Sequence, residues 1–104
     1  MTWVVLFLAG LFEVVWALAL KESDGFSKLG PTVLFLVALV ISMVLLAWAL
    51  RELPVGTGYA VWTGTGAVGA AIAGMLFFGE SAALSRILPI GLIAVGIVWL
   101  ALGE

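Results

Sequence analysis

The chain has 104 residues, of which 65% are hydrophobic and 10% charged, and its mean hydropathy is +1.37. Soluble domains are about 45–50% apolar and about 25% charged, so this composition indicates one small integral membrane domain over residues 1–104. The four scattered basic residues argue against nucleic-acid binding, and the lack of cysteine and histidine excludes disulfides, zinc–thiolate sites and Cys/His catalysis.

Four apolar runs, separated by short polar segments, follow one another along the chain. They predict transmembrane spans at residues 2–20, 32–50, 55–78 and 84–102. A helix needs about 20 residues to cross a hydrocarbon core of about 30 Å, and the first three runs have that length. The fourth run is short when counted from Ile87, so we expect its helix to begin before Arg86. Because the runs lack the alternating pattern of barrel strands, the sequence predicts an all-α bundle of four transmembrane helices.

The first run also resembles a signal peptide in one respect, since Ala17-Leu18-Ala19 matches a small-x-small cleavage site. However, no basic residue precedes this run, and Glu13 interrupts it. We therefore expect the run to remain in the protein as its first span.

Glu13 is the one charged residue that lies deep inside an apolar run. An ionised side chain at the bilayer centre costs at least about 2.5 kcal/mol, so such residues usually face a protein interior or a water-filled cavity. Gly10 and Trp16 share the helical face of Glu13. The indole of Trp16 offers an N–H donor and an aromatic face, which suit hydrogen bonding and cation–π attraction. The sequence therefore predicts a site for cations or protons at Glu13.

Polar and aromatic side chains of the second and third runs are candidates for the same site. Ser42 lies near the middle of the second run, and its hydroxyl is expected to bond either a carbonyl of its own helix or Glu13. In the third run, one helical face carries these residues, with Thr63 beside them: Tyr59, Trp62, Gly66, Gly69 and Ala73. Aromatic residues near span ends are often interfacial anchors, so Tyr59 is either an anchor or a pocket residue. Trp62 lies deeper and either lines a pocket or packs between helices.

Residues 64–69 match the pattern G-x-G-x-x-G of dinucleotide-binding proteins. That pattern needs a preceding strand and a βαβ unit, which a transmembrane span does not provide. We instead expect Gly64, Gly66 and Gly69 to loosen the third helix and allow it to bend.

The charges at the ends of the spans give only a weak prediction of topology. Lys21, Lys28 and Arg86 lie on one side of the membrane, whereas Arg51 and the terminal amine lie on the other. So small a bias permits insertion in both orientations, and hence an antiparallel dimer, under the positive-inside rule. A single topology with the N-terminus outside remains open.

The chain resembles the small multidrug resistance family, and within it the guanidinium-exporter subtype. The resemblance covers about residues 3 to 98 and rests on the stretches AGLFEVVWALALK, GFSKLGP, ELPVGTGYAVWTGTGAVGA and FFGES. Its most specific feature is Glu13 followed by Trp16, because drug-exporting relatives usually lack this tryptophan. Many exporters of this subtype carry a lysine near the end of helix four, where this chain has Trp99-Leu100-Ala101.

This resemblance implies a proton-coupled antiporter that exports guanidinium and small substituted guanidinium cations. It implies an antiparallel, dual-topology homodimer in the bacterial inner membrane, in which protons and substrate compete for the paired Glu13 carboxylates. Its pocket and hydrogen-bond network would comprise Gly10, Trp16, Ser42, Tyr59 and Trp62. Gly91 and Gly96 of helix four would form the dimer interface. The expected partners are the organic cation, protons, the lipid bilayer and a second copy of the chain, with no cofactor, metal or nucleic acid.

Three other functions remain open, and none of them is enzymatic. A multidrug exporter of hydrophobic quaternary ammonium ions is the nearest one, although such ions lack the N–H groups that a carboxylate binds in pairs. A dual-topology ion channel is a second, and the fixed charge of Glu13 would oppose anions there. In the third, a membrane adaptor, Glu13 would pair with a basic residue of another protein. An enzyme is not expected, because Glu13 has no paired nucleophile or metal ligand in the sequence.

Overall fold

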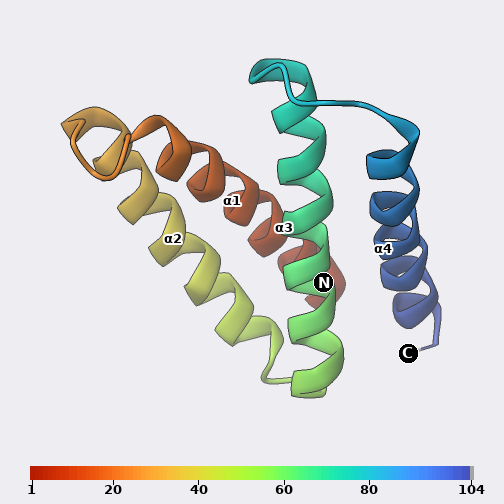
Figure 1. The fold of residues 1–104 in the computed structure, drawn as a ribbon. Coiled ribbons are helices and arrows are strands. Elements are labelled where there is room, and N and C mark those ends of the chain that lie inside the picture. The colour runs from red at the N-terminus through yellow and green to blue at the C-terminus, as the bar shows by residue number, and fades with distance from the viewer. Residues whose placement is uncertain (104) are drawn as a thin grey trace.

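The computed structural model describes residues 1–103, which form four α-helices joined by short connections (Figure 1). The helices are α1 (Thr2–Glu22), α2 (Leu29–Ala49), α3 (Val55–Phe77) and α4 (Leu84–Leu102). Each of them is long and apolar enough to cross a membrane. The prediction of an all-α protein with four spanning helices is therefore confirmed. The helix α2 begins at Leu29 instead of residue 32, because proline is tolerated in the first turn of a helix, where its missing N–H is not needed.

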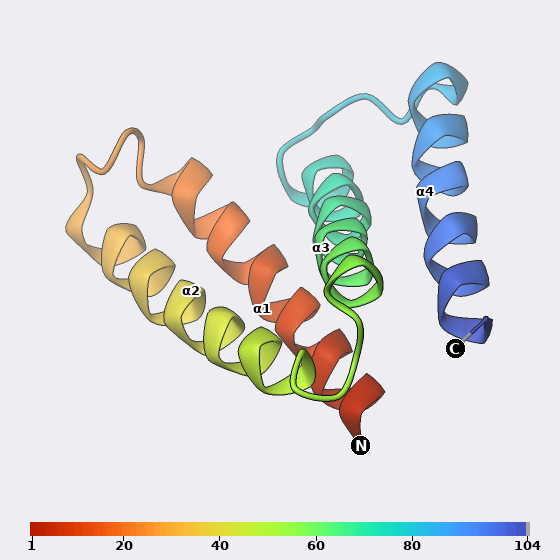
Figure 2. The same ribbon diagram turned by 90° about the horizontal axis from the view of Figure 1, so that it is seen from below.

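The four helices lie side by side in the order α2, α1, α3, α4 (Figure 2). The central pair is α1 and α3, while α4 contacts only α3 among the helices. The chain measures 40 × 34 × 17 Å along its principal axes. Because a helix with its side chains is about 10–12 Å across, the smallest dimension is less than two helix diameters. The chain is thus a thin, open layer of helices.

The core lies where α1, α2 and α3 meet. Its buried cluster consists of Leu6, Ala9, Leu46, Ala49, Val61 and Trp62. In a bilayer, such a cluster stabilises the fold through close van der Waals packing, since lipid tails are as apolar as the side chains themselves. By contrast, α4 contains no buried residue, so the first three helices form the packed body of the chain.

Glycines allow α1 and α3 to approach each other closely. A Cβ atom at Gly10 would lie 2.6 Å from Cγ2 and 2.8 Å from Cβ of Thr65. Likewise, a Cβ at Gly66 would overlap the carboxyl group of Glu13, and one at Gly69 would overlap the side chain of Val14. Since the residue numbers increase together on both helices, α1 and α3 run in the same direction along this contact.

The glycines of α3 therefore serve close packing in this conformation. The helix is continuous over Val55–Phe77, and Gly64 faces the side chain of Ile97 on α4. The bend expected at Gly64, Gly66 and Gly69 stays a prediction about a different conformation.

The contact at Gly10 leads to a first test of the fold. We expect Gly10→Ala to lower the free energy of unfolding by about 1–3 kcal/mol, because the Cβ of Thr65 is fixed to its backbone and cannot rotate away. Thermal unfolding in detergent micelles measures this effect. Gly30→Ala is the matched control, since a Cβ there meets nothing within 4 Å. Equal melting temperatures for the two variants would contradict the close approach of α1 and α3.

Candidate functional site

Glu13 lies midway along α1, on the side that faces α3. Its side chain is half-buried, and its carboxyl group rests against the backbone of Gly66. The oxygen Oε1 is buried and has no hydrogen-bond partner within residues 1–103. Within residues 1–103, one ion pair is present, between Arg86 and Glu80, with 2.5 Å between nitrogen and oxygen. It lies near the start of α4 and does not involve Glu13. The carboxylate is thus available to a group that the single chain does not supply.

Trp16 lies one turn beyond Glu13 on α1. Its indole N–H is also buried and without a partner in the described part of the chain. The ring contacts Phe35 of α2 in an edge-to-face arrangement, with centroids 5.9 Å apart and an interplanar angle of 80°. This contact orients the indole, and its N–H stays without a partner one helical turn from Glu13.

Ser42 connects all three packed helices through two hydrogen bonds. Its hydroxyl accepts a hydrogen bond of 3.0 Å from Nε1 of Trp62 on α3. It donates one of 2.7 Å to the backbone carbonyl of Ala9 on α1. A hydroxyl has a single proton, so no donor remains for Glu13. The sequence predicted a hydrogen bond from Ser42 to a carbonyl of its own helix or to Glu13, and both predictions are wrong. Ser42 faces the contact between α1 and α2, whereas Glu13 faces α3.

The aromatic pair on α3 divides between the core and the surface. Trp62 is buried in the core cluster, and its N–H is satisfied by Ser42. Tyr59 is 54% exposed, and its ring lies 5.5 Å from that of Trp62. Trp62 therefore packs inside the chain, and the role of both residues as pocket walls stays a prediction.

Thr65 is a polar residue of this region that the sequence interpretation missed. Its Oγ1 is the third buried side-chain atom without a hydrogen-bond partner, along with those of Glu13 and Trp16, within residues 1–103. Thr63, which the sequence placed beside the aromatic face, is exposed instead. The spacing contained the relevant signal, because Thr65 follows Trp62 by three residues and so shares its face.

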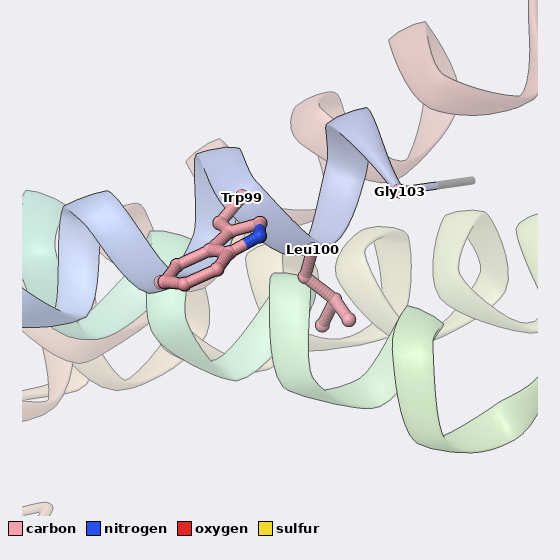
Figure 3. Close-up of a pocket in the computed structure, with 4 residues that line it drawn as sticks. Trp99, Leu100 and Gly103 are labelled. Atoms are coloured by element: carbon pink, nitrogen blue, oxygen red, sulfur yellow. The ribbon is translucent and has the colours of Figure 1, made fainter.

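A hollow of about 460 Å³ lies elsewhere, at the C-terminal end of α4 (Figure 3). It is lined by Gly96, Trp99, Leu100 and Gly103. Figure 3 shows Leu100 pointing toward α3, while Trp99 lies along the outer side of α4. None of the lining side chains is ionisable, so this hollow has no group that could bind a cation by charge.

Comparison with known proteins identifies the family. Residues 1–93 match the family described as Small Multidrug Resistance protein. The chain belongs to this family. It is 58% identical over 102 residues to a guanidinium exporter of Salmonella typhimurium, covering 98% of this chain and 97% of that relative. A guanidinium exporter of Yersinia pseudotuberculosis is 57% identical over 104 residues, the full length of both chains.

These matches confirm the resemblance read from the sequence motifs. Together with the four spanning helices, they make the protein a multi-pass protein of the bacterial inner membrane. Its family is one of transporters and not of enzymes.

The hydrogen bonds of Ser42 lead to a second test. We expect Ser42→Ala to destabilise the protein by about 1–2 kcal/mol, because it leaves the buried N–H of Trp62 unpaired. Chemical unfolding in detergent, followed by tryptophan fluorescence, measures the change. Ser85→Ala is the control, since Ser85 is exposed at the start of α4. If both variants unfold at the same denaturant concentration, the Ser42 bridge does not stabilise the packing of α1, α2 and α3.

Proposed function

We propose that this protein exports guanidinium and small substituted guanidinium cations in exchange for protons. The observation that carries the proposal is the buried, unpartnered carboxylate oxygen of Glu13 in the middle of a spanning helix. Burying a carboxylate without a partner at this depth costs free energy, so we expect it to bind a proton or a cation. The names of the relatives at 56–58% identity support guanidinium as that cation.

The chemistry of the site suits a flat cation with N–H groups. A carboxylate accepts two parallel hydrogen bonds from a guanidinium group, which gives both energy and orientation. The indole of Trp16 can add cation–π attraction, worth about 2 kcal/mol when the cation is desolvated. Bulky quaternary ammonium ions have no N–H groups and would leave the carboxylate oxygens without hydrogen bonds. For this reason we favour guanidinium over the multidrug alternative.

Proton coupling follows from occupancy of the same oxygens. The ionised carboxylate of Glu13 attracts a cation, whereas the protonated carboxyl group has no charge with which to do so. Proton and substrate therefore exclude each other. If the site opens to one side of the membrane at a time, mutually exclusive occupancy produces antiport.

A second copy of the chain would complete the site, and several features of α4 support such a dimer. The helix has no buried residue, and Cβ atoms at Gly91 and Gly96 would meet nothing within 4 Å. Small residues of this kind let another helix approach closely. A partner protomer would cover the open layer and bring a second Glu13 to the site. The small charge bias between the two membrane sides is compatible with an antiparallel arrangement.

Transport by reconstituted protein tests the proposal. We expect native protein in proteoliposomes to take up guanidinium while protons move out of the vesicles. We expect Glu13→Gln to abolish both fluxes, because the neutral amide cannot bind a proton or form an ion pair with a cation. Glu22→Gln is the matched control, since Glu22 is exposed at the end of α1. We expect it to transport at close to the native rate.

Other outcomes would favour the alternative functions. Guanidinium current without proton movement would identify a channel. Stronger competition by tetraphenylphosphonium than by guanidinium would identify an exporter of hydrophobic quaternary cations. The absence of guanidinium flux from the native protein would contradict the proposal directly.

A further inference from the structure

The hydroxyl of Thr65 is a buried polar group without a hydrogen bond. A threonine inside a helix commonly donates its proton to a carbonyl one turn back, which satisfies it within the same helix. Thr65 makes no such bond, and its Oγ1 has no partner of any kind within residues 1–103. Leaving a hydroxyl unpaired in an apolar environment costs free energy, so this arrangement needs a physical reason.

The position of Thr65 relates it to Glu13. Thr65 and Gly66 are consecutive residues of α3 that contact α1 at Gly10 and at the carboxyl group of Glu13, respectively. Oγ1 of Thr65 lies 3.6 Å from where a Cβ of Gly10 would be. Because helical side chains lean toward the N-terminus of their helix, the Glu13 side chain lies over the turn that contains Gly10. The two unpartnered oxygens therefore belong to the same crossing of α1 and α3.

Thr65 also lies on the side of this crossing that faces α4. It lines a groove of about 280 Å³ between α1, α3 and α4, together with residues such as Leu11 and Ile97. Thr65 thus contacts α1 from the part of α3 that also faces α4.

We propose that Thr65 is a positioning residue of the Glu13 site, whose hydroxyl donates a hydrogen bond to the ionised carboxylate. This inference rests on the proposed function of Glu13 as the substrate and proton site. Threonine has two common χ1 rotamers in a helix, so rotation about χ1 re-aims the hydroxyl without moving either backbone. The bond holds the carboxylate with one edge toward the cation and stabilises its charged form, which alone binds substrate.

Few other ionisable groups can set the balance between proton and cation at this site. The helix α2 contains none, α3 contains only Tyr59, and α4 contains only Arg86, which is paired with Glu80 near the start of that helix. On α1, Lys21 and Glu22 lie at the far end, two turns beyond Glu13. In the proposed dimer, Glu13 of the second copy would add a further charged group. A hydroxyl that favours the ionised carboxylate would thus shift the pH at which guanidinium binds.

Calorimetric titration of the full chain in detergent with guanidinium chloride, over a series of pH values, tests the inference. We expect Thr65→Val to raise the pH midpoint of guanidinium binding by about one unit, because it removes one hydrogen bond to a charged group but keeps the side-chain shape. At a pH well above the midpoint, the affinity of Thr65→Val should approach the native value but stay below it, since the carboxylate is then ionised in both proteins and only the native protein orients it. Thr65→Ser keeps the hydroxyl and should retain the native midpoint.

Thr63→Val is the matched control, because it removes an exposed hydroxyl from the same helix. It should leave the pH midpoint unchanged. An unshifted midpoint in Thr65→Val overturns the inference while leaving the proposed function standing. An equal shift in Thr65→Val and Thr65→Ser also overturns it, since the effect would then come from packing. A native chain that binds no guanidinium at any pH overturns the proposed function, and this inference with it.

Discussion

The carboxyl group of Glu13 rests on the backbone of Gly66, and the geometry of the site depends on this contact. A side chain at residue 66 would occupy the volume of the carboxyl group, so glycine is what lets the acid lie between two spanning helices. The same crossing requires Gly10 opposite Thr65 and Gly69 opposite Val14. These three glycines bring α1 and α3 close enough to shield one oxygen of Glu13, yet they supply no group that neutralises it.

The polar groups within the membrane fall into two sets with different physical roles. Ser42, the indole of Trp62 and the carbonyl of Ala9 satisfy one another and hold α1, α2 and α3 in place. The buried polar atoms of Glu13, Trp16 and Thr65 have no partners in the described part of the chain. A binding site needs both sets, because unsatisfied groups keep a useful orientation only when rigid neighbours fix the helices that carry them.

Features that depend on local composition could be predicted from the sequence. Side-chain contacts that depend on how the helices are arranged could not. The spanning helices follow from apolar runs, and Glu13 is conspicuous because no other charge lies so deep in one. The partner of Ser42 was missed, because it depends on which helices are neighbours and on which sides they face. Thr65 was missed because a threonine in an apolar helix ordinarily satisfies its own hydroxyl, and only the packing reveals that it does not. The predicted roles of Tyr59 and Trp62 as pocket walls, and of Gly91 and Gly96 as an interface, would depend on a second copy of the chain, which no sequence pattern places.

In the proposed exchange, one carboxylate holds either a proton or an organic cation. Proton release on addition of guanidinium measures this exclusion. Guanidinium is added to the detergent-solubilised protein in weakly buffered solution, at a pH where part of the Glu13 population is protonated, and the freed protons are recorded with an indicator dye. We expect guanidinium to displace protons from the native protein and none from Glu13→Gln. Saturable guanidinium binding to the native protein without any proton release would contradict the proposed exchange.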